Sequence, residues 1–219
     1  MKIVHQNLQR QINFEEHQFW SLVIENPKEF YRLSSDFYKQ SIGEDGGFVV
    51  SHNNESINAE KSMLLIHDYY SLSCNNKKTE SLLQNTILDT INNGDFIELI
   101  SQINQKIILL NDKVLSEIDL DIKYDELTID KIVKLSNFKF EEESKLLNKI
   151  VTLIDLNIKL RKIKFIVFIG IFNVLERQEI KDLLKQLKYM QMSALFVDSK
   201  TSDIECFQKI IIDKDLCEI

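Results

Sequence analysis

The chain has 219 residues, of which 44% are hydrophobic and 28% are charged, the composition of an ordinary globular protein. It contains one proline and five glycines, so no stretch is typical of a flexible linker or a disordered tail. Taken alone, the formal net charge of −7 argues against nucleic-acid binding, because lysine and arginine drive phosphate binding by displacing counterions. A basic strip on an acidic body can still bind DNA.

The cysteines and the apolar runs indicate where the protein works. Cys74, Cys206 and Cys217 are odd in number and show no CxxC spacing, which favours free thiols in a reducing cytosol. The first ten residues lack the apolar segment of a signal peptide. The longest apolar run, 165–171, is too short to span a bilayer. We therefore expect a cytoplasmic protein without a membrane partner.

The amino-terminal part of the sequence predicts short strands around one helix. Polar turns separate the first strands, and the apolar run 19–24 has the length of a buried strand. Pro27 favours the first turn of a helix, because proline loses no needed hydrogen bond there, and Gly43 ends that helix. Strands over 48–50 and 62–66 follow.

The middle of the sequence predicts helices. The pattern is helical from 77 to 117, with one break at 92–95. A further helix is expected over 127–135 and a long one over 144–160. Residues 138–141 alternate between apolar and charged side chains, which predicts a short strand.

The carboxyl-terminal part returns to strands and helices. We expect strands over 165–169, 194–197 and 207–212, with a helix over 176–190 between the first two. Apolar strands that alternate with helices are typical of a parallel sheet. The sequence therefore predicts an α/β protein.

This pattern divides the chain into two predicted domains. Residues 1–75 and 159–219 together form a discontinuous α/β head with a mainly parallel sheet, because both segments alternate strands and helices. Residues 76–158 form an inserted helical leg, because their apolar positions recur at helical spacing.

Motifs of nucleotide chemistry are missing from the sequence. It contains neither GxxxxGK[ST] nor GxGxxG, and the loop 25–30 after the first long strand has no glycine to bring backbone N–H groups onto a phosphate. Lys28 is then a surface lysine at a helix start. His67 and Asp68 follow a strand, where they suit either a catalytic base or a turn with a capping aspartate.

An acidic cluster lies between the predicted leg helices. Its members are Glu117, Asp119, Asp121, Asp125 and Glu126. Clustered carboxylates suit Ca²⁺, which takes six to eight oxygen ligands, but the glycine of an EF-hand loop is missing. The spacing alone favours a solvated acidic loop over a calcium site.

A basic run precedes the carboxyl-terminal strands. It consists of Lys159, Arg161, Lys162 and Lys164. Cations at the end of a helix complement the helix dipole, and they can also contact phosphates. The residues themselves leave both interpretations open.

Several of these segments, in this order and spacing, resemble one known family. They are EIDLDIKYDELTI at 117–129, DKIVKL at 130–135, the basic run with the strand 164–169, LFVD at 195–198, and the strands 22–25 and 63–66. Together they resemble the small accessory protein of type II-A CRISPR systems, a family dedicated to spacer acquisition. The resemblance covers almost the whole chain, and the first twenty residues match least.

The resemblance implies a degenerate P-loop-ATPase-like head without a working nucleotide site, and a helical leg. It implies a non-catalytic homotetrameric ring that binds double-stranded DNA ends in a positively lined hole and is held by Ca²⁺. The integrase proteins and the effector nuclease are the implied partners in adaptation. Such a ring can carry positive charge inside and acidic charge outside, which agrees with the net charge of −7.

Carried over by position, the resemblance gives roles to both charged clusters. The five acidic residues become candidate calcium ligands, and the four residues of the basic run become candidate DNA contacts. Lys123 departs from the family, whose members usually carry an acid there, and its charge weakens cation binding by repulsion.

Two alternatives from other classes remain at this point. The first is a nucleotide-dependent enzyme that uses His67, Asp68 and the acidic cluster with Mg²⁺. The second is a docking protein whose acidic cluster binds a protein partner and which binds no DNA.

Overall fold

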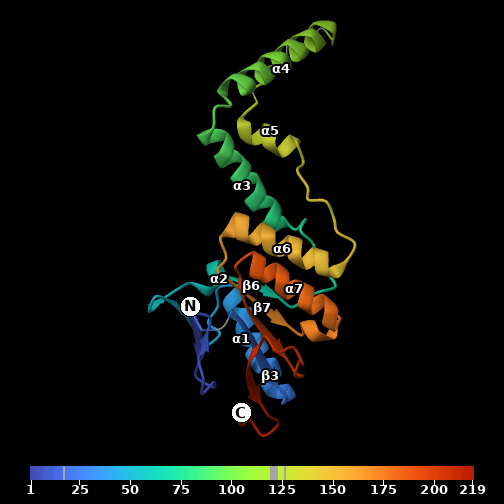
Figure 1. Cartoon of the computed structure of the whole chain (residues 1–219). Helices are drawn as coiled ribbons and strands as arrows, with labels where there is room; N and C mark the ends of the chain where they lie inside the picture. Colours follow the sequence, from blue (N-terminus) through green and yellow to red (C-terminus); the bar gives the residue numbers. More distant parts are fainter. Residues whose placement is uncertain (17, 119–122, 126) are drawn as a thin grey trace. The chain divides into compact units, whose positions relative to one another are not determined.

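A computed structural model describes residues 1–16, 18–118, 123–125 and 127–219. The chain forms two compact units (Figure 1). Met1–Cys74 and Glu142–Ile219 form the first, which we call the sheet unit, and Asn75–Glu141 form the second, the helical unit. Among the described helices, none is long and apolar enough to cross a membrane.

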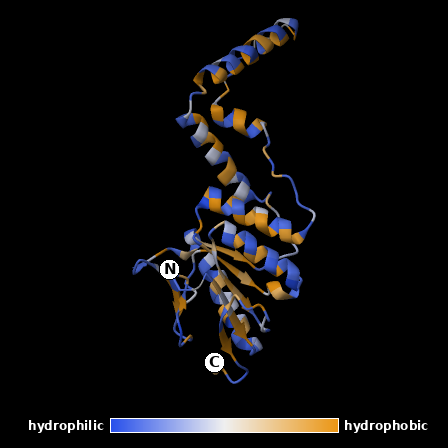
Figure 2. Cartoon of the chain, viewed as in Figure 1, coloured by the Kyte–Doolittle hydropathy of each residue, from blue (hydrophilic) through white to orange (hydrophobic). Residues whose placement is uncertain are grey.

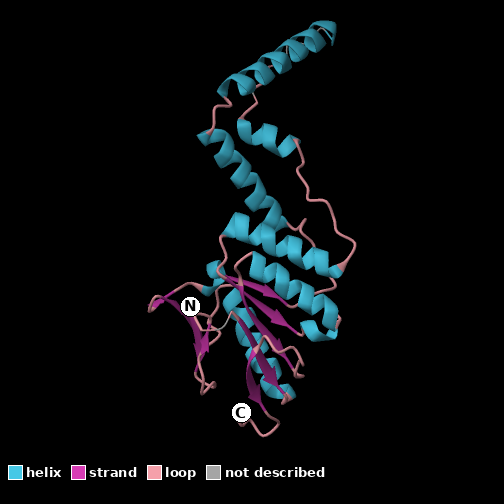
Figure 3. Ribbon diagram, viewed as in Figure 1, coloured by secondary structure: helices cyan, strands magenta, loops and turns pink. Residues whose placement is uncertain are grey.

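The sheet unit contains two sheets and the helices that cover them (Figure 3). Its elements are β1 (Lys2–His5), β2 (Ile12–Asn13), β3 (Phe19–Ile24), α1 (Pro27–Ser41), β4 (Phe48–His52), β5 (Glu55–Ser56), α2 (Ala59–Ser62), β6 (Met63–Ile66), α6 (Leu146–Arg161), β7 (Phe165–Ile169), η1 (Ile171–Asn173), α7 (Arg177–Tyr189), β8 (Ser193–Asp198) and β9 (Gln208–Ile212). The larger sheet has the order β6-β7-β8-β3-β9, and all neighbouring strands in it are parallel. The smaller sheet, β2-β1-β4-β5, is antiparallel.

Helices cover both faces of the parallel sheet. The chain passes from β3 through α1 to β6 in one direction across the sheet. It passes from β7 through α7 to β8 in the opposite direction. Right-handed crossovers in opposite directions place their helices on opposite faces. Leu33 and Phe37 of α1 accordingly pack into one core with Trp20, Leu22 and the small sheet. α6 and α7 lie side by side (Figure 1).

The elements of the sheet unit follow from local sequence. All six residues of β3 are buried, as expected for a central parallel strand. The Asn26 side chain accepts hydrogen bonds from the backbone N–H groups of Lys28 and Glu29, and Pro27 opens α1. The predicted parallel α/β sheet is therefore confirmed.

The described residues of the helical unit form three helices, α3 (Lys77–Asn93), α4 (Ile97–Ile118) and α5 (Ile129–Leu135). α3 and α5 contact each other. α4, which is described over its whole length, has no buried side chain. Figure 2 shows hydrophobic and hydrophilic residues interspersed along it.

The structure differs from the sequence prediction at two places. The helix expected over 144–160 was assigned to the leg, but α6 belongs to the sheet unit, where Ile150 and Ile154 are fully buried. The inserted unit is thus 75–141 rather than 76–158. The predicted strand over 138–141 is an irregular segment within the described residues, because the Asn75 side chain binds both the N–H and the carbonyl of Phe140.

Candidate functional site

The basic run lies where α6 ends and β7 begins. Lys162 caps α6 in the left-handed region, with φ of 54°, and its N–H donates to the carbonyl of Ile158. This reversal leaves the side chains of Lys159, Lys162 and Lys164 exposed. Lys159 forms an ion pair with Asp155 at 2.6 Å, so part of its charge is already neutralised.

Arg161 differs from the other three cations of the run. Its side chain is half-buried, and its guanidinium donates to the Asn157 side chain at 3.0 Å and to the carbonyl of Glu60 at 2.7 Å. Burial lowers the pKa of Arg161, and the nearby Glu60 carboxylate raises it. The guanidinium therefore joins the end of α6 to α2.

A lysine that the sequence analysis did not include lies beside this run. The backbone N–H of Lys164 donates to the carbonyl of Ser62 at 2.7 Å, and Met63 of β6 pairs with Phe165 of β7. Lys61, which is exposed, precedes Ser62 and therefore lies next to the run in space. A hundred residues separate the two segments in the sequence, and only the pairing of β6 with β7 brings them together.

The acidic cluster is described in part. Glu117 lies in the last turn of α4, and Asp125 lies in the segment 123–125, where both side chains are exposed. Asp119, Asp121 and Glu126 lie outside the described residues. The Tyr124 hydroxyl donates to a carboxylate oxygen of Asp112 at 2.7 Å, which raises the pKa of this tyrosine.

This hydrogen bond ties the segment 123–125, within the acidic cluster, back to α4. Tyr124 also contacts the carbonyl of Ile108 at 3.3 Å. Lys123 is exposed beside it. Within the part of the chain that the structure describes, no three His, Cys, Asp or Glu side chains are grouped to hold a metal ion.

Two polar side chains at the carboxyl edge of the parallel sheet, Asn26 and Asp198, form hydrogen bonds within the protein. Strand order reverses between β3 and β8, which is where doubly wound folds bind nucleotides. There the Asn26 side chain caps α1 and donates to the carbonyl of Lys214 at 3.0 Å. The buried Asp198 carboxylate accepts from the N–H groups of Ser199 and Phe172, while burial raises its pKa.

The Asp68 carboxylate is engaged by hydrogen bonds within its own turn. Asp68 accepts hydrogen bonds from the N–H groups of Tyr70 and Ser71 and from the Ser71 hydroxyl, which lower its pKa. His67 contacts the edge of the Tyr38 ring at 5.4 Å between centroids. The interpretation of Asp68 as a residue that caps a turn is confirmed.

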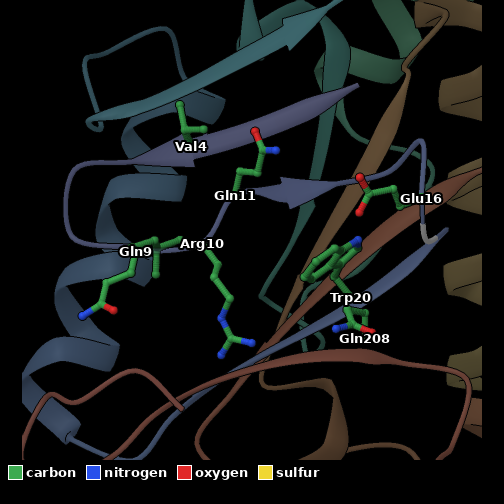
Figure 4. A pocket seen from close by; sticks show the side chains of 8 residues that line it. Val4, Gln9, Arg10, Gln11, Glu16, Trp20 and Gln208 are labelled. Atoms are coloured by element: carbon green, nitrogen blue, oxygen red, sulfur yellow. The ribbon is translucent and has the colours of Figure 1, made fainter.

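A groove of about 570 Å³ opens beside the small sheet (Figure 4). Its lining combines the Trp20 ring with mostly polar side chains: Val4, Leu8, Gln9, Arg10, Gln11, Glu16 and Gln208. The Arg10 guanidinium donates to Glu218 at 2.9 Å and to the carbonyl of Ile219 at 2.7 Å. The Arg10 charge is therefore engaged within the protein.

These features define a class: a parallel α/β protein with an inserted helical unit and exposed cations at the amino edge of its sheet. The family model of the CRISPR-associated protein Cas_Csn2 matches residues 40–216. The chain belongs to this family, as the resemblance to the type II-A CRISPR accessory proteins predicted. It is 24% identical to the CRISPR-associated protein Csn2 of Streptococcus agalactiae over 196 residues, which cover 89% of this chain and 87% of that relative.

Proposed function

We propose that this CRISPR-associated protein is a non-catalytic, sequence-independent binder of double-stranded DNA that takes part in spacer acquisition. It acts as a calcium-stabilised homotetrameric ring, together with the integrase proteins and the effector nuclease. The observation that carries the proposal is the basic run, in which Lys162 and Lys164 are exposed and form no ion pair with a described residue. Free cations that contact phosphates carry no sequence preference.

The strand order supports a degenerate P-loop-ATPase-like head. The first strand of the parallel sheet, β3, lies inside it between β8 and β9 and leads into α1, as in doubly wound nucleotide-binding folds. The loop after β3 lacks glycine, and Asn26 occupies the first N–H groups of α1. These groups are then not free for a phosphate, which favours DNA binding over the nucleotide-dependent alternative.

The exposed face of α4 supports assembly from several copies. Large apolar side chains along it are open to solvent, among them Leu109 at 60% and Leu110 at 59% exposed. Many exposed large apolar side chains on one element favour an interface. A second copy of the chain offers the same face, which is the geometry of a twofold contact.

Calcium is proposed for the acidic cluster. Glu117 and Asp125 are exposed carboxylates on either side of the residues 119–122, which include Asp119 and Asp121. Hard carboxylate oxygens suit Ca²⁺. Lys123 lies in the same run and weakens the site by repulsion, so we expect fewer or less tightly bound ions than five acids alone would hold.

The binding claim is tested by fluorescence anisotropy with two labelled linear duplexes of equal length and unrelated sequence. We expect equal affinities and a steep linear fall of log affinity with log salt between 50 and 200 mM, because released counterions drive phosphate binding. Absence of binding at the lowest salt would contradict the proposal. A strong preference for one duplex would contradict sequence independence.

A further inference from the structure

The amino edge of the parallel sheet holds a cationic cluster built from two distant segments. Its members are Lys61, which precedes β6, and Lys162 and Lys164, which precede β7. Because Met63 pairs with Phe165, Ser62 lies opposite Lys164 and Lys61 lies two residues before the first pair. Neighbouring strands are about 4.8 Å apart, so the backbones of these lysines are close neighbours.

Two hydrogen bonds fix these segments beyond the strand pairing itself. The N–H of Lys164 donates to the carbonyl of Ser62 at 2.7 Å. The Arg161 guanidinium donates to the carbonyl of Glu60 at 2.7 Å, and its second bond, to Asn157, anchors it on α6. Both hydrogen bonds end on the backbone carbonyls that flank Lys61, those of Glu60 and Ser62. They therefore fix the position of the Lys61 backbone relative to the basic run.

The electrostatics around the cluster favour an external anion. Lys61, Lys162 and Lys164 are exposed, and none of them forms an ion pair with another described residue. Glu60, the acid next to Lys61 in the sequence, is half-buried, and its carboxylate lies beside Gly43. Ammonium groups that approach one another repel, and a phosphate bound between these lysines would relieve that repulsion.

We infer that Lys61 is a phosphate-contacting residue of the DNA site, and that Arg161 is a positioning residue which holds Lys61 beside Lys162 and Lys164. The inference rests on the proposed DNA binding and adds to it a residue outside the basic run. It also removes Arg161 from the direct contacts, because its guanidinium donates to the Asn157 side chain and to the Glu60 carbonyl within the protein.

The test compares Lys61→Ala and Lys162→Ala with Lys214→Ala as the matched control. Lys214 is an exposed lysine that follows β9, at the opposite edge of the sheet. For a linear duplex, removal of one phosphate contact flattens the slope of log affinity against log salt by about one unit. That corresponds to about 3.5-fold less loss of affinity between 50 and 200 mM salt. Lys61→Ala and Lys162→Ala should each show this change, and Lys214→Ala should show none.

The outcomes separate the inference from the function on which it rests. If Lys162→Ala flattens the slope and Lys61→Ala does not, the role of Lys61 is overturned while DNA binding stands. If the unchanged protein binds no duplex at low salt, both are overturned. Thermal melting of each variant confirms that alanine, which favours helices, leaves the end of α2 folded.

Arg161→Lys tests the positioning role separately. Lysine keeps the charge but cannot donate in two directions as the planar guanidinium does. If Arg161 acts by positioning, Arg161→Lys flattens the slope by about one unit, and adding Lys61→Ala changes it no further. An unchanged slope in Arg161→Lys would show that charge alone matters and would overturn the positioning role.

Discussion

The two units of this chain bury their apolar residues to very different extents. In the sheet unit, every residue of β3 is buried and helices cover both faces of the parallel sheet. In the helical unit, α4 buries no side chain over its 22 residues. The sheet unit thus buries its parallel sheet within a single chain. The other exposes the kind of surface that proteins cover by assembly, so stability and assembly should respond to mutations in different units.

The largest effect is expected from a cavity in the core of the sheet unit. Phe196 is fully buried in β8, and its ring stacks on Phe168 with centroids 5.0 Å apart. Phe196→Ala should lower the free energy of unfolding by about 3–5 kcal/mol, since removal of a buried aromatic side chain leaves a cavity. Urea unfolding measures this. A change below about 1 kcal/mol would mean that the core is not packed as described.

The next effect is expected from a substitution on α4, which should change the stability of the single chain little but should weaken assembly. Leu110→Asp should change the unfolding free energy of the monomer by about 0.5 kcal/mol or less, because the side chain is exposed. If copies cover this face, the same change removes the burial of a leucine, worth about 1.5–3 kcal/mol. Assembly should then weaken about tenfold or more. Light scattering after size-exclusion chromatography measures it.

The exposed Lys113, also on α4, offers a matched position for that experiment. Lys113→Asp introduces the same side chain at a charged site and should leave assembly less affected than Leu110→Asp. Equal effects from both variants would mean that added negative charge, rather than lost apolar contact, controls assembly.

The smallest effect, confined to acid pH, is expected from the sheet unit. The buried His5 imidazole accepts a hydrogen bond from the N–H of Asn7 at its Nδ1 atom and lies 3.6 Å from Asp36. Burial, and then the charge of Arg32, lower the pKa of His5 from about 6.5, while Asp36 and Glu29 act in the opposite direction.

The unfolded chain therefore binds a proton at His5 at a higher pH than the folded chain does. Stability should rise with pH through this range and should be lost as the pH falls below about 6.5, towards the lower folded pKa. Denaturation midpoints between pH 5 and pH 8 measure it. In His5→Gln this part of the pH dependence should be absent. An unaltered profile would assign it to other groups.

Local sequence patterns predicted most elements of both units. Apolar runs of strand length gave β3, β7 and β8, and helical spacing gave α1, α4 and α7. The partner of each element depends on non-local packing, which one sequence does not contain. Residues 144–160 were correctly predicted as a helix but assigned to the wrong unit, because an apolar stripe does not specify what covers it.

In the candidate site, too, sequence patterns predicted local features but not contacts between distant segments. The basic run was recognisable because its cations are neighbours in sequence. Lys61 was missed because only the register of β6 on β7 brings it there. In the sequence, Arg161 is indistinguishable from the three surface lysines of the run. Its hydrogen bonds to Asn157 and Glu60 depend on the folded structure. The calcium ligands stay a prediction, because Asp119, Asp121 and Glu126 lie outside the described residues.

The most direct test of the central claim is a gel-shift titration with linear and covalently closed circular DNA, with Ca²⁺ or with a chelator. A calcium-held ring that admits DNA at its ends should shift linear DNA in Ca²⁺, lose that shift in chelator, and leave the closed circle unshifted. Equal shifts of both DNAs would contradict entry from the ends. No shift of either DNA at low salt would contradict DNA binding itself and favour a protein that docks other proteins.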